Sequence, residues 1–250
     1  MQHFAILGGG RLARHMRHYF TLSGLPVSAW SRDGAAAFNT HPIANNLARL
    51  QATLSPASHV LLLVSDQGIP ELLQRYPFLH EKTLVHCSGA QSIPGVAGAH
   101  PLMTFGHELY GLEQYQQVPF VVDQGHELRH LLPGLCNPYF PIRPEDKARY
   151  HALCVMAGNF SQILWQAASE RFSALGLPPE TLHPYLQQVV RNFIANPYGA
   201  LTGPLSRGDQ HTIHRNLRSL DRDPLQDVYQ AFVDLHRSEH STDRLQEAAS

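Results

Sequence analysis

The sequence has few charged residues and no excess of either sign. Charged side chains make up 16% of the 250 residues, with 19 Lys and Arg against 20 Asp and Glu, which gives a formal net charge of −1. An average globular chain has roughly 25% charged residues. The even balance argues against a general nucleic-acid-binding protein, which carries a basic excess. The 43% hydrophobic share argues against a disordered chain.

Long apolar runs and paired cysteines are also missing. The most apolar stretch, Val60–Val64, has five residues, whereas a transmembrane helix needs about 20. The N-terminal Met1–Leu7 lacks the basic start of a signal peptide. Cys87, Cys136 and Cys154 show no CxxC spacing, which argues against a disulfide framework or a thiolate zinc site. We therefore expect a cytoplasmic protein with reduced thiols, with no membrane or nucleic-acid partner.

Histidine is abundant, with 17 residues. Four pairs have the helical spacing that zinc ligands can use, namely His15/His18, His126/His130, His211/His214 and His236/His240. The pair His126/His130 lies in an HExxH sequence, His126-Glu127-Leu128-Arg129-His130. No further cysteine or carboxylate nearby completes a clear set of ligands for any of the four pairs. We therefore expect no metal site. A metal-dependent hydrolase that uses these histidines is a further alternative, and it would require bound zinc.

Strand and helix patterns alternate over residues 1–143. Five short apolar runs predict strands, at Phe4–Leu7, Val27–Trp30, His59–Val64, Thr83–Cys87 and Phe120–Val122. Helical spacing occurs at Arg11–Leu22 and Ile69–Tyr76, and we expect one strand and a short helix within Asn39–Ser58. Strands that alternate with helices predict a doubly wound parallel sheet, and therefore an α/β fold.

The pattern becomes helical after residue 143. Apolar residues keep helical spacing from Glu145 to Ala174, about 30 residues. Further helices are predicted at Glu180–Ala195, Asp209–Leu220 and Pro224–His236, followed by a polar tail. The boundary is predicted between residues 143 and 144, with an all-helical domain over 144–250.

A glycine turn follows the first predicted strand. Gly8-Gly9-Gly10-Arg11-Leu12-Ala13 fits GxGxxA. In this motif glycine makes a tight turn and admits a pyrophosphate, which faces the N–H groups of the next helix. We predict that Gly8, Gly9, Gly10, Arg11 and Leu12 bind a dinucleotide, so that residues 1–143 form an NAD(P)-binding Rossmann domain. The alternatives are a glycine turn with no ligand and a former nucleotide-binding site that no longer binds its ligand.

The end of the second strand favours NADP over NAD. An NAD site normally has Asp or Glu there, but this strand ends in Trp30, Ser31 and Arg32. Arg32 can hold a 2′-phosphate, and Ser31 can donate a hydroxyl bond. The alternatives are that Arg32 is an ordinary surface residue, or that Asp33 serves the ribose of NAD.

Polar residues follow two further strands. Ser65 and Asp66 come after His59–Val64, and Ser88 and Gly89 come after Thr83–Cys87. Ligands of open α/β sheets bind outside the carboxyl ends of the strands, so we expect these residues beside the nicotinamide. Asp66 has the alternative role of capping the next helix.

These motifs and three later segments resemble a known group of proteins. The segments are Val85–Ala90, His100–Phe105 and Thr202–Asp209. The chain resembles a family of predicted NAD(P)-binding oxidoreductases with a C-terminal helical domain of unknown function. That family is similar to the 6-phosphogluconate dehydrogenase-like superfamily, which includes pyrroline-5-carboxylate reductase, the β-hydroxyacid dehydrogenases and the deazaflavin-dependent NADP oxidoreductases. The resemblance implies a Rossmann domain, a helical domain that dimerises and a cleft between them.

One residue departs from that pattern. The β-hydroxyacid dehydrogenases use a lysine four residues before an asparagine on the interdomain helix. Asn159 matches the asparagine, but position 155 is valine. The lysine that acts as acid catalyst in that family is therefore missing at the matching position of this chain.

Three residues are the catalytic candidates. His100 lies in a predicted loop and can act as acid or base near neutral pH, or can fix the loop through the backbone. His151 and Asn159 are eight residues apart on the long helix, about 80° around its axis, so both can face one cleft. Asn159 lies in the apolar Val155–Leu164, where a buried amide needs a ligand or a helix–helix hydrogen bond.

The loop after residue 202 offers weaker candidates. Asp209 is placed to cap the helix that follows it, Arg207 can bind a substrate carboxylate or a partner subunit, and Thr202 can reach the cleft.

Together these patterns predict an NADP-dependent oxidoreductase, with NAD as the second choice of cofactor. It would transfer a hydride between the nicotinamide and a small carbonyl or imine substrate in the interdomain cleft, and form a homodimer through its helical domain. His100 would be acid or base, with Asn159 and His151 positioning the substrate. The alternative is a non-catalytic NADP-binding sensor or interaction protein, which Val155 favours slightly.

Overall fold

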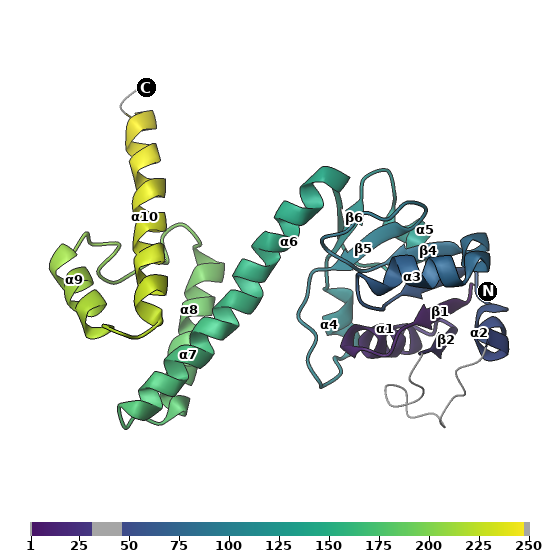
Figure 1. Ribbon diagram of the computed structural model, residues 1–250, viewed down its shortest axis with the longest axis horizontal. Helices are drawn as coiled ribbons and strands as arrows, with labels where there is room; N and C mark the ends of the chain where they lie inside the picture. The colour runs from purple at the N-terminus through teal and green to yellow at the C-terminus, as the bar shows by residue number, and fades with distance from the viewer. Residues whose placement is uncertain (1, 32–46, 248–250) are drawn as a thin grey trace. The chain divides into compact units, whose positions relative to one another are not determined.

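The computed structural model describes residues 2–31 and 47–247 (Figure 1). The chain divides into two compact units, Met1–Trp165 and Gln166–Ser250. Each unit is described by itself. The predicted boundary at 143/144 lies within the first unit, directly after its last strand.

The first unit contains a sheet whose described strands number seven. They are β1 (Phe4–Leu7), β2 (Val27–Trp30), β3 (His59–Leu62), β4 (Thr83–His86), β5 (Ala97–Pro101), β6 (Phe120–Asp123) and β7 (Tyr139–Ile142). Their order is β2-β1-β3-β4-β5-β6-β7. Strands β1 to β5 are parallel, and β6 runs antiparallel to β5 while β7 is parallel to β6. The predicted α/β fold with a mostly parallel sheet is confirmed, and β5 and β7 are strands that the sequence patterns did not predict.

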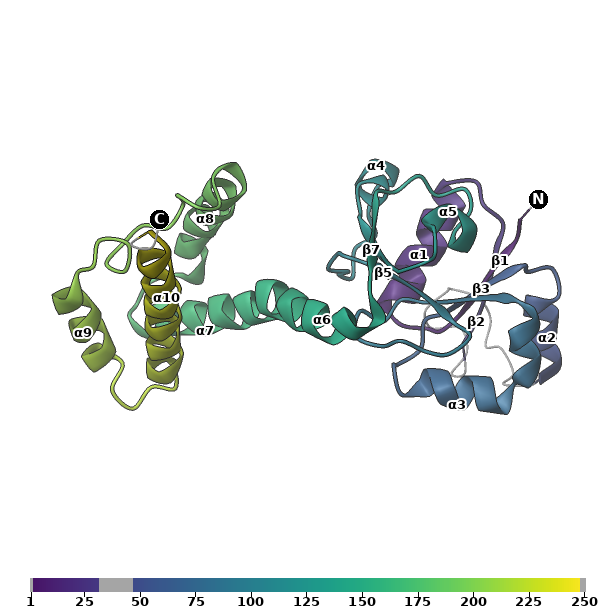
Figure 2. The same cartoon turned by 90° about the horizontal axis from the view of Figure 1, so that it is seen from above.

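Helices cover both faces of this sheet (Figure 2). They are α1 (Arg11–Leu22), α2 (Leu47–Leu54), α3 (Gly68–Arg75), α4 (Leu112–Gln116) and α5 (Leu128–Leu131), with short 3₁₀ turns η2 (Pro77–Glu81) and η3 (Pro144–Asp146). Helices α1, α4 and α5 share one core with the strands, and α2 and α3 share the other. The short helix α2 was predicted, whereas residues 32–46, where we expected part of a further strand, lie outside the described residues.

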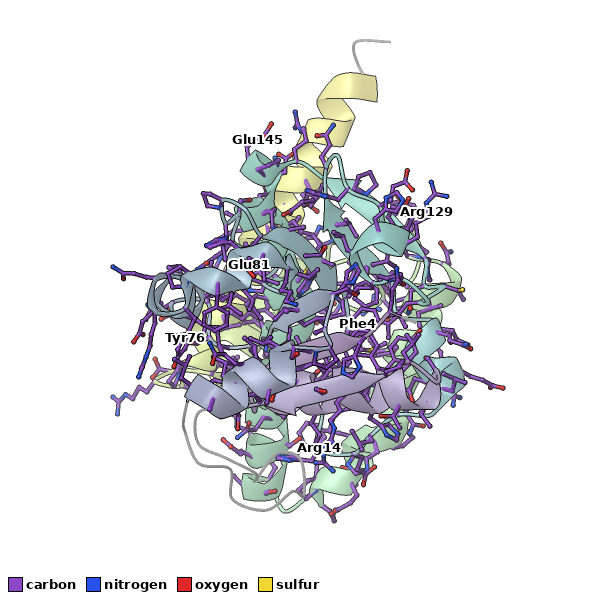
Figure 3. All side chains as sticks on the ribbon, turned by 90° about the vertical axis from the view of Figure 1, so that its right-hand side faces the viewer. Phe4, Arg14, Tyr76, Glu81, Arg129 and Glu145 are labelled. Carbon is purple, nitrogen blue, oxygen red and sulfur yellow. The ribbon has the colours of Figure 1, made fainter. Side chains whose placement is uncertain are left out.

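Strand alternation assigns side chains to the two cores. Phe4 and Ile6 face the core of α1, whereas Ala5 and Leu7 face that of α2 and α3. Phe4 stacks on Phe20 of α1, with ring centroids 4.5 Å apart. Figure 3 shows Phe4 in the interior and charged residues such as Arg129 and Glu145 at the periphery. Burial on both faces explains why the parallel strands are apolar throughout.

The predicted long helix contains a π turn. It consists of α6 (Lys147–Val155), the π segment η4 (Met156–Phe160) and α7 (Ser161–Ala174). The Ser161 hydroxyl donates to the carbonyl of Ala157 at 3.0 Å. A π turn is a rare irregularity that occurs often at functional sites, and this one contains the predicted Asn159.

The described part of the second unit contains helices and turns. They are η5 (Pro179–Leu182), α8 (His183–Ala195), α9 (Gln210–Ser219) and α10 (Leu225–Glu247). Asp209 accepts a hydrogen bond from Thr212 N at 3.0 Å, so its predicted cap on α9 is confirmed. Helix α10 continues past the predicted end at His236, into the segment expected to be a tail. None of the helices in the described ranges is long and apolar enough to cross a membrane.

Candidate functional site

The glycine turn brings the main chain after β1 against the main chain after β3. Gly8 has a φ of +148°, and a Cβ built there would lie 2.1 Å from the carbonyl oxygen of Leu63. Both the backbone conformation and this contact require glycine. The predicted tight turn is therefore present, and its cause is the close approach of Leu63.

The first turn of α1 is open to a ligand. Gly10 is the N-cap residue, no side chain caps the helix, and the first turn has no acidic residue. A Cβ on Gly10 would meet nothing within 4 Å. Unpaired N–H groups and the helix dipole favour an anion at such a position. Gly9 and Arg11, both predicted to bind the dinucleotide, are exposed here, and Leu12 is partly exposed.

Strand β2 ends beside this turn. Gly8 N donates to the carbonyl of Trp30 at 2.9 Å, and Ser31, which follows, is buried. Arg32 and Asp33, on which the choice between NADP and NAD depends, lie outside the described residues. That choice stays a prediction.

The polar ends of β3 and β4 are joined by a hydrogen bond. The Ser88 hydroxyl donates to Asp66 Oδ2 at 2.8 Å, and Ser88 Oγ accepts from the N–H groups of Ala90 and Gln91. The alternative role of Asp66 as a helix cap is not seen, because Gln67 is the N-cap residue of α3 and has no side-chain cap bond. Ser65 precedes Asp66, and its carbonyl accepts from Gly68 N at 2.8 Å.

The sequence pattern predicted a loop at His100, and this prediction is wrong because His100 lies on strand β5. Its Nδ1 is hydrogen-bonded to the Tyr150 hydroxyl at 2.7 Å, and its ring centroid is 6.0 Å from that of His151. Gly89 lies against both imidazoles, since a Cβ there would be 2.7 Å from His151 Nδ1 and 3.2 Å from His100 Nε2. The structure therefore brings together His100, His151 and Gly89 and adds Tyr150, which the sequence reasoning missed.

This cluster lies at the same edge of the sheet as the glycine turn. Gly8 follows β1, Asp66 follows β3, and Ser88 and Gly89 follow β4, all of which run parallel. The carboxyl ends of parallel strands meet at one edge, where open α/β sheets bind their ligands.

Two histidines of the site are neutral at neutral pH. Burial, together with the charges of His151 and Lys147, lowers the pKa of His100 to about 4, while the charge of Asp66 opposes this shift. Burial also lowers the pKa of His86 to about 4. Burial raises the pKa of the Tyr150 hydroxyl, which therefore stays protonated. The site thus offers neutral imidazoles and a phenol.

A buried ion pair lies next to this cluster. Lys147 Nζ is 2.6 Å from Asp123 Oδ1, and the two side chains are 3% and 13% exposed. His86 is fully buried, its Nδ1 accepts from Ser88 N at 3.1 Å, and its Nε2 has no hydrogen-bond partner. The sequence pattern did not indicate Lys147 and Asp123, and it indicated His86 only as part of the polar segment that ends β4. The signal overlooked for Lys147 is its position one helical turn before Tyr150 and His151 on the predicted helix.

Asn159 has different surroundings from those expected. It is exposed in η4, as are Met156, Phe160 and Ile163 around it. The buried environment expected for this amide is therefore not seen in the described structure. Its proposed contact with substrate stays a prediction.

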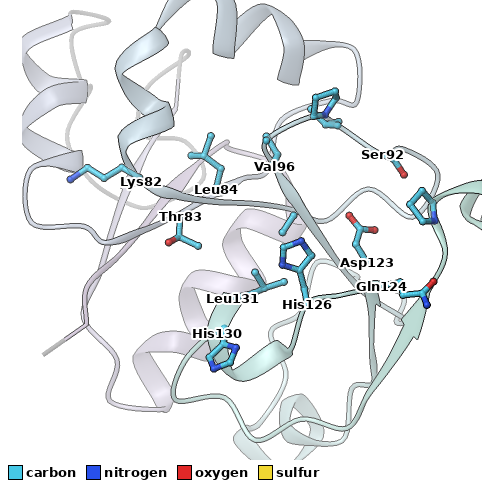
Figure 4. A pocket seen from close by; sticks show the side chains of 15 residues that line it. Lys82, Thr83, Leu84, Ser92, Val96, Asp123, Gln124, His126, His130 and Leu131 are labelled. Carbon is cyan, nitrogen blue, oxygen red and sulfur yellow. The ribbon is translucent and has the colours of Figure 1, made fainter.

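A separate depression of about 760 Å³ lies at the starts of β4 and β5, away from the glycine turn (Figure 4). Its lining includes Lys82, Thr83, Val96, His126 and His130. It contains none of the residues predicted to bind cofactor or substrate. Among the described residues, no group of three or more His, Cys, Asp or Glu comes together to hold a metal ion.

One family model matches part of the chain. Residues 123–235 match the family model described as a domain of unknown function, DUF2520. The matched segment includes Asp123, Lys147, Tyr150 and His151. A comparison with curated proteins gave no match.

Several solved structures have a similar fold and match 96% of this chain. A proposed NADP oxidoreductase of Bacteroides fragilis has a TM-score of 0.72 at 21% identity, covering 96% of this chain and 98% of that one. A protein of Thermotoga maritima has a TM-score of 0.69 at 24% identity, covering 96% and 99%. An imine reductase of Streptomyces aurantiacus has a TM-score of 0.64 at 15% identity, covering 96% and 95%. The resemblance predicted from the sequence is confirmed at the level of the fold.

Proposed function

We propose that this protein is an NADP-dependent oxidoreductase that transfers a hydride between the nicotinamide and a small carbonyl or imine substrate. One observation carries the proposal: an uncapped glycine turn and a cluster of His100, Tyr150 and His151 occur at the same edge of a parallel sheet. The first arrangement suits a dinucleotide and the second suits proton transfer. The similar structures include an NADP oxidoreductase fold and an imine reductase fold, which agrees with this chemistry.

The residues present fit a dinucleotide. Gly8 makes the turn, and the N–H groups of the first turn of α1, around Arg11 and Leu12, would hold the pyrophosphate. Ser31 and Arg32 would hold the 2′-phosphate of NADP, and NAD is the second choice. When bound, the nicotinamide supplies or accepts the hydride.

The side chains of the cluster handle the proton. With Nδ1 bonded to Tyr150, His100 has Nε2 beside Gly89, where it can face a substrate heteroatom. Because its pKa is about 4, His100 at neutral pH is a base, which suits oxidation of a hydroxyl or amine. In the reverse direction its imidazolium is the acid, so reduction of a carbonyl is favoured at lower pH. His151 and Asn159 would position the substrate.

We also propose that the protein is a homodimer through its helical region. In the described part of the second unit, few apolar residues are buried, namely Leu182, Ile213 and Val233, whereas many large apolar residues are exposed. The exposed ones include Tyr185, Phe193, Ile194, Tyr198 and Phe232. So small a core contributes little stability, and large exposed apolar patches mark interaction sites. A second copy would cover them.

Two measurements test the function. Calorimetric titration with NADPH should show saturable binding, and a panel of keto acids, cyclic imines and aldehydes should then reveal consumption of NADPH by its absorbance. His100→Ala should abolish that consumption while it leaves cofactor binding intact. No binding of NADPH or NADH would refute the proposal. Binding without turnover across the panel would support the alternative, a non-catalytic NADP-binding sensor, which Val155 in place of the expected lysine favours.

A further inference from the structure

The chain has only two lysines, Lys82 and Lys147. Lys147 lies at the start of α6 with its side chain 3% exposed, and its Nζ contacts Asp123 Oδ1 at 2.6 Å. The other carboxylate oxygen of Asp123 accepts a hydrogen bond from Gly98 N at 2.7 Å. The ion pair therefore links three elements, α6, β6 and β5.

The pair lies directly on β5. A Cβ on Gly98 would be 2.5 Å from Lys147 Nζ and 2.7 Å from each oxygen of Asp123, so position 98 has no room for a side chain. His86 is opposite Gly98 on β4, and His100 is two residues further along β5, on the same face of the sheet. The buried charges of Lys147 and Asp123 thus lie close to both His86 and His100, the two histidines that are neutral at neutral pH.

We propose that Lys147 and Asp123 are positioning residues, which fix α6 on β5 so that Tyr150 and His151 meet His100. Tyr150 and His151 follow Lys147 by three and four residues, so all three share one face of the helix. A helix held at Gly98 by its first residue presents the next turn to His100. The proposal rests on the proposed function only for its effect on turnover, because the arrangement itself is independent of any substrate.

The charge of Lys147 also acts on His100. The groups that face His100 are Tyr150, His151 and Lys147 of α6, Asp66 after β3, and His86 of β4. Burial is the main cause of its low pKa, and the positive charge of Lys147 adds to it. Loss of that charge should therefore raise the pKa of His100, which a merely structural role of Lys147 would not require.

The experiment is a histidine titration by NMR, with the His100 signal assigned by its loss in His100→Asn. Lys147→Met leaves Asp123 buried without its partner and is expected to fold poorly. The double variant Lys147→Met/Asp123→Asn removes both charges and keeps an acceptor for Gly98 N, so it is the informative protein. Lys82→Met, which removes the other lysine, is the matched control.

We expect the double variant to fold, to titrate His100 at higher pH than the wild type, and to lose at least 10-fold in kcat with the affinity for NADPH unchanged. Lys82→Met should match the wild type in all three measurements. A folded double variant with the wild-type titration of His100 and the wild-type kcat would overturn the proposal. If no protein turns over any substrate, the raised titration of His100 still supports the positioning of α6, while the proposed function fails separately.

Discussion

Gly89→Ala tests whether the contact between the two imidazoles serves turnover. The new Cβ would lie 2.7 Å from His151 Nδ1, whereas ordinary contacts begin at 3.4 Å. His151 must therefore retreat by about 0.7 Å, and a displacement of about 1 Å at a reacting centre costs about 100-fold in rate. We expect kcat to fall roughly 10- to 100-fold, equal to about 1.4 to 2.7 kcal/mol. The free energy of unfolding should change by only about 1 kcal/mol, since a side chain can move aside.

The assay follows NADPH consumption with the best substrate of the panel, together with calorimetric binding of NADPH and a urea unfolding curve. Gly111→Ala is the control, because Gly111 has a φ of −70° and a Cβ there would meet nothing within 4 Å. A Gly89→Ala protein that folds, binds NADPH and keeps the wild-type kcat would refute the role given to the contact of His100 with His151.

Three further predictions concern folding and assembly. Gly8→Ala should lower the free energy of unfolding by roughly 3 kcal/mol, because the Cβ would overlap the Leu63 carbonyl at a strained φ; a wild-type urea midpoint would contradict this. Since the pKa of His86 falls from 6.5 to about 4 on folding, the unfolded chain binds the extra proton between these values. The stability that His86 contributes should therefore be fully present above pH 6.5 and fall by about 3 kcal/mol towards pH 4, with a similar loss from His100, whose pKa is also about 4; urea midpoints that do not change over this range would disprove it. Phe193→Glu, at a residue 60% exposed, should convert a dimer to a monomer in light scattering; a monomeric wild type would end that proposal.

The first part of the fold was predictable residue by residue. Strand β1, helix α1 and strand β2 have the predicted bounds, because the apolar runs are clear and glycine turns separate them. Strand β5 was missed because Ala97–Pro101 has small residues and a histidine where a buried strand usually has large apolar ones. Its conformation depends on pairing with β4 and β6, which a local pattern does not report.

The site was predictable only in part, for a similar reason. Strand ends indicated Asp66, Ser88 and Gly89, since the carboxyl edge of a parallel sheet is a general binding position. The contact of Lys147 with Asp123 joins residues 24 positions apart, and nothing in either neighbourhood indicates it. The expected burial of Asn159 assumed that an apolar stretch is covered within its own chain, and the sequence gives no information on that.

The π turn at Met156–Phe160 changes how this helix is compared with others. A π turn closes its hydrogen bonds between residues five apart and not four, so it accommodates one residue more than the α-helical turn it replaces. Side chains after it are therefore rotated by about 100° from where an uninterrupted α-helix would place them. A spacing of four residues puts two side chains on one face of an α-helix, but Val155 and Asn159 stand on either side of the start of η4. An alignment of this helix with an uninterrupted α-helix therefore needs a one-residue gap within Met156–Phe160, and the residues before and after this segment have to be matched separately.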